Sequence, residues 1–173
     1  MESAKRTPMM KFLRLLLGMM MLAPAIAGAD PRDAATALQS GLDAYAGADF
    51  RGARQALRPL ADRGSAIAET LMGVMAAKGQ GSRADPATAV AWWLRAANRG
   101  YGPAQLALAK ALATGRGVTQ DMGAAWVWAR LAVAAGNGTA VEAAALADGL
   151  QRGFSVETLA KLEAQRAAWR PWG

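Results

Sequence analysis

The stretch GQGSRADPATAVAWWLRAANRG, residues 79–100, is followed 36 positions later by GRGVTQDMGAAWVWARLAVAAG, residues 115–136. The residues shared at this offset are Gly79 and Gly115, Gly81 and Gly117, Asp85 and Asp121, Ala89 and Ala125, Trp92 and Trp128, Ala96 and Ala132, and Gly100 and Gly136. Such matches at one fixed spacing indicate a structural repeat. A period of this size is typical of helical arrays, in which each unit buries its apolar face against its neighbours.

Each repeat has the start and stop signals of a helical hairpin. Gly79 and Gly115 are suited to close a first helix, because glycine tolerates the left-handed conformation found there. Asp85 and Asp121 are suited to cap a second helix, and Pro86 fits the first turn of the helix after Asp85. We therefore predict that residues 65–100 and 101–136 each form two antiparallel helices.

The flanking segments predict one further hairpin on each side, which gives an all-α chain of about four hairpins. Residues 30–64 contain two helical patterns joined by a short turn at residues 47–49. Residues 137–173 predict a final, atypical pair in which Thr139 and Ser155 cap the helices. Terminal units of arrays are usually divergent because one face meets water. The tail after Trp169 is expected to fray.

The two quoted stretches resemble the Sel-one-like repeat, a relative of the tetratricopeptide repeat, with its Gly-x-Gly loop, Asp cap, Ala-x-x-Trp and closing Gly. The pattern covers residues 66–136, and residues 41–64, GLDAYAGADFRGARQALRPLADRG, resemble a shorter tetratricopeptide-type unit. The resemblance implies a right-handed α-solenoid of stacked antiparallel hairpins. It also implies a non-enzymatic adaptor that binds a protein or peptide partner on its concave surface.

The first 29 residues have the parts of a secretory signal. Four basic residues precede or enter a short apolar run, and two small-x-small sites follow Pro24. We predict a signal peptide over residues 1–29 with cleavage near Ala27 or Ala29, giving a periplasmic protein whose net charge falls from +7 to about +4. The alternative is an inner-membrane anchor at residues 12–22, although this run is shorter than the ~20 residues that span a bilayer.

The amino-acid composition excludes most of the common types of catalytic site. The chain has no cysteine and no histidine, so thiolate sites and histidine-based triads are impossible. Asp85 and Asp121 are interpreted as helix caps, and the Gly-x-Gly loops lack the Gly-Lys-Ser/Thr of a phosphate-binding loop. We expect no catalytic residue, metal or cofactor, and the dispersed basic residues do not predict nucleic-acid binding. The alternative function is a cell-wall-directed enzyme or ligand binder that uses carboxylates alone.

The candidate binding residues are tryptophans and arginines of the two repeats. Trp92 and Trp128 occupy equivalent positions and are expected to pack between helices. Trp93 points about 100° away from Trp92, and Trp126, two residues before Trp128, also points away from its neighbour, so both are candidates for exposed contacts. Arginines suit a groove that receives an acidic peptide or C-terminal carboxylate, whereas the alternative is a solvated helix face. The predicted partner-binding residues are Trp93, Arg95, Arg99, Arg116, Trp126 and Arg130.

Overall fold

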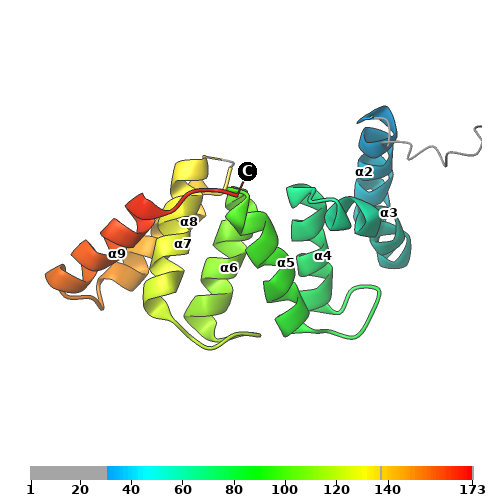
Figure 1. Cartoon of the computed structure of the whole chain (residues 1–173). Coiled ribbons are helices and arrows are strands. Elements are labelled where there is room, and N and C mark those ends of the chain that lie inside the picture. Colours follow the sequence, from blue (N-terminus) through cyan, green and yellow to red (C-terminus); the bar gives the residue numbers. More distant parts are fainter. Residues whose placement is uncertain (1–30, 137, 173) are drawn as a thin grey trace, which may run out of the picture. The chain divides into compact units, whose positions relative to one another are not determined.

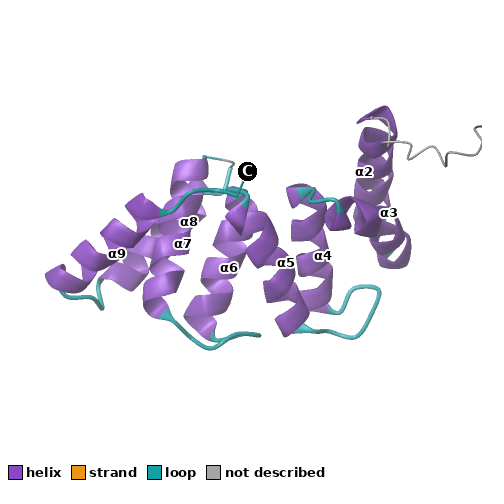
Figure 2. Cartoon of the chain, viewed as in Figure 1, coloured by secondary structure: helices purple, strands orange, loops and turns teal. Residues whose placement is uncertain are grey.

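The computed structural model describes residues 31–136 and 138–172. The predicted leader at residues 1–29, and its alternative as an anchor at 12–22, lie outside these residues. From Arg32 onward the chain forms one compact unit. Its described part contains eight α-helices and no strand (Figures 1 and 2). The prediction of an all-α solenoid of helical hairpins is confirmed.

The helices follow one another along the chain, and most sequence neighbours also pack together in space. Their bounds are α2 Pro31–Ala46, α3 Phe50–Asp62, α4 Ala66–Lys78, α5 Pro86–Asn98, α6 Gly102–Thr114, α7 Met122–Ala135, α8 Ala140–Gln151 and α9 Val156–Ala168. From α3 to α8 each helix packs against the next. The first helices of successive hairpins, α4, α6 and α8, also contact one another, while α9 packs against α7.

Side-chain caps fix where most of these helices begin. The Asp85 and Asp121 carboxylates accept hydrogen bonds from the N–H groups of Thr88 and Ala124, as predicted. The predicted cap at Ser155 is also present. Thr139 stands before α8, but its hydroxyl makes no capping hydrogen bond, so that expectation is wrong. The Thr139 side chain instead lines the groove described below.

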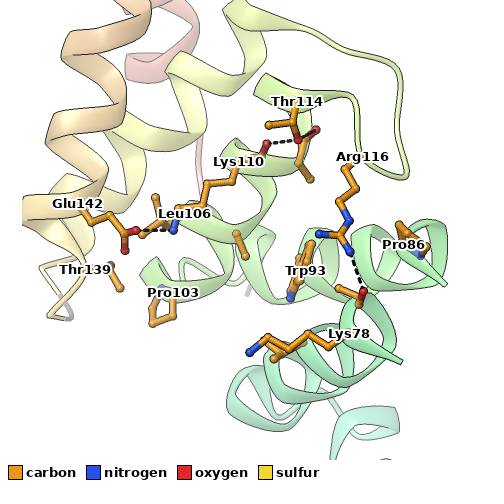
Figure 3. Close-up of a pocket in the computed structure, with 14 residues that line it drawn as sticks. Lys78, Pro86, Trp93, Pro103, Leu106, Lys110, Thr114, Arg116, Thr139 and Glu142 are labelled. Atoms are coloured by element: carbon orange, nitrogen blue, oxygen red, sulfur yellow. Dashed lines mark hydrogen bonds and ion pairs between the residues drawn. The ribbon is translucent and has the colours of Figure 1, made fainter. Parts of the chain in front are cut away.

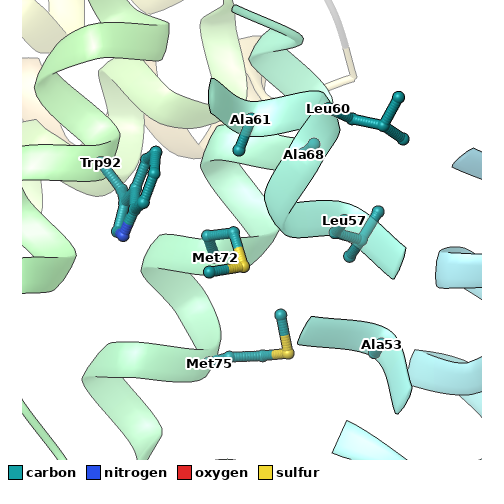
Figure 4. Packing of buried hydrophobic residues seen from close by; sticks show 8 residues of the cluster. All are labelled: Ala53, Leu57, Leu60, Ala61, Ala68, Met72, Met75 and Trp92. Atoms are coloured by element: carbon teal, nitrogen blue, oxygen red, sulfur yellow. The ribbon is translucent and has the colours of Figure 1, made fainter. Parts of the chain in front are cut away.

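Small residues at equivalent positions hold the hairpins close together. Ala53, Ala89 and Ala125 are all fully buried, one in each second helix. The 36-residue spacing therefore extends into α3, although the first hairpin has the shorter inner turn. In the first core cluster, Met72 of α4 lies between Trp92 of α5 and Leu57 of α3 (Figure 4). Alanine allows the close helix approach, and larger side chains fill the remaining space.

The second glycine of each Gly-x-Gly loop touches the preceding hairpin. A Cβ placed on Gly81 would lie 2.9 Å from the Phe50 carbonyl oxygen, and one on Gly117 would overlap the Pro86 carbonyl oxygen. Phe50 and Pro86 are the first residues of α3 and α5. Both glycines also have positive φ, 75° and 79°. The same backbone contact thus joins each inner loop to the start of the preceding second helix.

The C-terminal tail is attached through residue 172. The Trp172 N–H donates to the Asn98 carbonyl oxygen at 2.7 Å. The Trp169 ring meets Trp128 edge-on, with 6.0 Å between ring centroids. The expectation that the tail frays is therefore wrong for residues 170–172, because the Trp172 hydrogen bond to Asn98 holds this segment and the Trp128 contact holds Trp169 just before it.

Alanine at Gly117 should destabilise the fold more than alanine at Gly136. Both glycines have positive φ, which costs an L-residue about 1–2 kcal/mol. Gly136 has open space around a Cβ, whereas Gly117 abuts the Pro86 carbonyl. We expect the overlap to add about 1–3 kcal/mol for Gly117→Ala. Urea unfolding followed by circular dichroism measures both variants, and equal losses would contradict the proposed loop contact.

Candidate partner-binding groove

A groove of about 800 Å³ lies across the first helices of three successive hairpins (Figure 3). This volume is in the range of pockets that enclose small ligands. The groove exists because the stacked hairpins place α4, α6 and α8 beside one another. Apolar side chains form most of its lining, including Val74, Ala77, Pro103, Leu106, Ala107 and Ala111.

Trp93 of α5 contributes a fixed aromatic wall to this groove. Its indole N–H donates to the Thr70 carbonyl oxygen at 3.3 Å, and the ring is half-buried. The indole lies directly against Gly73 of α4, where a Cβ would collide with the ring nitrogen. Gly73 therefore admits the tryptophan, and the hydrogen bond holds the ring in one orientation.

Four charged side chains line the groove. The Lys110 ammonium lies 2.5 Å from a Glu142 carboxylate oxygen, so this pair is neutral overall. Arg116 donates through Nη2 to the Ala77 carbonyl oxygen at 3.1 Å, near the end of α4. Within residues 31–136 and 138–172, neither Lys78 nor Arg116 forms an ion pair with a carboxylate. The groove therefore carries excess positive charge near the end of α4.

Arg95 and Arg99 are occupied in the junction between the first two hairpins. Glu69 of α4 is fully buried, with Oε1 2.9 Å from Arg95 Nη2 and Oε2 3.6 Å from Arg99 Nε. Arg95 Nη2 also donates to the Ala61 carbonyl oxygen at 2.9 Å, which joins α5 to α3. These arginines do not line the groove. Their contacts indicate a structural role at this junction.

The protonation of Glu69 reflects this burial. Desolvation raises the pKa of its carboxyl group above the usual 4.5, and the nearby Arg95 and Arg99 charges oppose the shift. Asp85 behaves in the opposite way, because hydrogen bonds from Thr88 lower the pKa of its carboxyl group. The two acids therefore give opposite contributions to the pH dependence of stability.

Trp126 and Arg130 lie away from the groove. The Trp126 side chain is only 4% exposed and packs in a cluster with Ala129 and Leu162 of α9. The expectation that Trp126 is an exposed contact is therefore wrong, because α9 packs on α7. The Arg130 guanidinium lies 5.8 Å from the centre of the Trp126 ring. Trp92 is buried as expected, whereas its repeat partner Trp128 is half-buried.

Two of the six predicted residues, Trp93 and Arg116, line the groove. The sequence-based prediction did not include four lining residues, Lys78, Lys110, Leu106 and Glu142, because its candidates were mainly residues of the second helix of each repeat. For the residues of α6, the sequence does contain a pattern that indicates a shared face. Pro103, Leu106 or Ala107, Lys110 and Thr114 recur at three- or four-residue spacing, which places them on one helix face.

Among the described residues, no helix has the length and apolar content needed to cross a membrane. The same residues contain no group of three or more acidic, histidine or cysteine side chains able to hold a metal ion.

The stacked hairpins define a helical-repeat protein of the solenoid class. The Sel1 repeat family model matches residues 66–101 and 102–137. Residues 66–137 therefore contain two Sel1 repeats, and the resemblance seen in the sequence of residues 66–136 is confirmed. Sel1 repeat proteins generally mediate protein–protein interactions and typically serve as non-catalytic scaffolds. A comparison with curated proteins gives no significant match.

Solved structures show the same fold. A protective antigen of uropathogenic Escherichia coli strains that displays an SLR fold matches with a TM-score of 0.72 and 22% identity. A Sel1 repeat protein from Oxalobacter formigenes matches with a TM-score of 0.56 and 26% identity. The matches cover 79% and 60% of this chain, but only 30% and 41% of those chains. This chain therefore corresponds to less than half of either protein.

A double-mutant cycle should detect the Glu69–Arg95 contact. We expect Arg95→Met to cost about 1–3 kcal/mol, less than for a fully buried pair because the Arg95 side chain is 39% exposed, and Glu69→Gln to cost less than Arg95→Met because burial already disfavours the Glu69 charge. The double variant should lose less than the sum, by about 1 kcal/mol. Urea unfolding of the four proteins gives the coupling, and strict additivity would contradict an energetic link.

The raised pKa of Glu69 predicts a specific pH dependence. The folded state holds the Glu69 proton more tightly than the unfolded state, so ionisation of this group reduces stability. The free energy of unfolding of the wild type, minus that of Glu69→Gln, should fall as pH rises from 4.5 through the raised pKa. Unfolding curves at pH 4 to 7 test this, and a difference that rises with pH would indicate a lowered pKa.

Proposed function

We propose that the chain is a non-enzymatic, exported helical-repeat adaptor that holds a segment of a protein partner in the groove across α4, α6 and α8. The observation that carries this proposal is the groove itself, which is apolar and open to a ligand of limited size. Its lining comes from three successive hairpins. A surface assembled from the repeat frame is the kind of surface that solenoid proteins use for binding.

Rigid positioning of the lining supports this proposal. Trp93 is held by Thr70 and Gly73, and Arg116 is held by the Ala77 carbonyl. Side chains that are already fixed lose little conformational entropy when a partner binds. A short segment can therefore bind in this groove without ordering the helices that form it.

The export part of the proposal depends on the sequence of residues 1–29. Their basic start, apolar run and small-residue sites support passage into the periplasm, with cleavage near Ala27 or Ala29. Retention of residues 12–22 as an inner-membrane anchor would place the same adaptor at the membrane surface. The intact mass of the protein recovered from cells distinguishes cleavage from retention.

No observation favours the alternative of a carboxylate-only enzyme. Acid chemistry on glycosides uses two carboxyl groups at a set separation. Among the described residues that line the groove, Glu142 is the single carboxylate, and it is paired with Lys110.

Filling the groove should abolish partner capture. Ala107 is a half-buried lining residue of α6, so Ala107→Trp places a large side chain in the groove without changing its charge. The matched control is Ala160→Trp on the exposed surface of α9. Crosslinking in cells, followed by affinity purification and mass spectrometry, compares the three proteins.

We expect the wild type and Ala160→Trp to recover the same partner, and Ala107→Trp to lose it by at least about tenfold. Circular dichroism and thermal unfolding must first show that Ala107→Trp retains the fold. A folded Ala107→Trp protein that captures the same partner as the wild type would show that binding occurs elsewhere.

A further inference from the structure

We infer that the groove takes a short acidic peptide segment whose carboxylate binds between Lys78 and Arg116. This inference rests on the proposed function and specifies the chemistry of the partner. The three observations behind it are an unbalanced charge in the groove, a preorganised arginine, and a comparison of the two repeats.

The charge imbalance comes from Lys78 and Arg116. Lys110 and Glu142 neutralise each other at 2.5 Å, whereas Lys78 and Arg116 have no carboxylate partner within residues 31–136 and 138–172. Both cations line an otherwise mostly apolar groove. A carboxylate brought there by a partner would gain charge-assisted hydrogen bonds at the edge of an apolar surface, where such bonds are stronger than in bulk water.

Arg116 is already placed to receive this carboxylate. It lies between Gly115 and Gly117, which have φ values of 71° and 79°, and Gly117 is in contact with the Pro86 carbonyl. One N–H of the guanidinium donates to the Ala77 carbonyl oxygen, adjacent in sequence to Lys78. A guanidinium has five N–H donors, so most remain for a ligand. Figure 3 shows the Arg116 side chain extending to the end of α4, whose last residue is Lys78.

The other repeat shows that the fold does not require these two charges. Gln80 stands at the position equivalent to Arg116, in a loop of the same Gly-x-Gly form. Thr114 stands at the position equivalent to Lys78 and likewise ends its helix. The C-terminal end of a helix favours a cation, but α6 ends at the neutral Thr114 and has no basic residue in its last turn. The positive charges at 78 and 116 are therefore additional to the repeat frame.

The apolar lining indicates what accompanies the carboxylate. Val74 and Ala77, which precede Lys78 by about one helical turn or less, and the half-buried ring of Trp93 line the groove and offer a surface for aliphatic side chains. We therefore assign the ligand as a few residues of peptide with an acidic group beside apolar ones. The carboxylate has two possible sources, an Asp or Glu side chain or the C-terminus of the partner chain, and the test below separates them.

The test measures binding of defined peptide pools to the full-length chain by fluorescence anisotropy. Each pool contains labelled heptapeptides with Leu, Val or Phe around a central Asp, Asn or Lys, made with either a free or an amidated C-terminus. We expect the amidated Asp pool to bind at least about tenfold more tightly than the amidated Asn and Lys pools. If the chain end supplies the carboxylate, the free Asn pool should show this advantage over the amidated Asn pool. Equal binding by all six pools would overturn the inference.

A charge-neutral variant localises the site. Lys78→Thr with Arg116→Gln introduces the residues found at the equivalent positions of the other repeat, so the fold should be retained. We expect it to lose at least about tenfold in affinity for the carboxylate-bearing pool and most of the salt dependence. The matched control, Arg63→Met with Arg152→Met, removes two exposed charges that do not line the groove. Unchanged affinity in Lys78→Thr/Arg116→Gln would overturn the inference.

The inference and the proposed function can fail separately. If Ala107→Trp loses the cellular partner while Lys78→Thr/Arg116→Gln retains it, the groove binds a partner but the acidic assignment is wrong. If Ala107→Trp also retains the partner, the proposed groove function is wrong as well.

Discussion

The structure depends on one backbone contact that is made twice. The second glycine of each Gly-x-Gly loop lies against the first carbonyl of the preceding second helix, Gly81 on Phe50 and Gly117 on Pro86. No side chain fits between these backbones, so each loop packs directly against the preceding hairpin. This contact stacks the hairpins, and the stacking brings α4 into contact with α6, and α6 into contact with α8. The groove is a consequence of this arrangement, because most of its lining comes from those same helices, with Trp93 of α5 and Arg116 of the following loop added.

The repeats share a frame but differ in what they place on it. Asp caps, buried alanines and closing glycines recur at the same positions. Other equivalent positions differ in charge. The first repeat has the buried Glu69 with Arg95 and Arg99, and the second repeat has Gln105, Leu131 and Ala135 at the same three positions. The buried carboxylate and its two arginines are thus exchanged together for neutral residues. Gln80 and Arg116 differ in the same way, and that difference gives the groove part of its positive charge.

The sequence predicted the frame well because each of its signals is local. Glycine at a helix end and aspartate before a helix act within a few residues, and the caps at Asp85 and Asp121 are where they were expected. The site was predicted less well because exposure depends on distant segments. Trp126 is buried by α9, more than thirty residues later, and Arg95 is engaged by Glu69 and by the Ala61 carbonyl of the preceding hairpin. No local pattern contains this information.

Hydrogen–deuterium exchange of the free full-length chain and of its purified partner complex tests the central claim most directly. If the groove is the binding surface, slowed exchange on binding should concentrate in the second half of α4, along α6, in the loop at Arg116 and at the start of α8. The outer helices α3, α7 and α9 should change little. Protection confined to those helices or to the ends of the array, with α4 and α6 unchanged, would contradict the account.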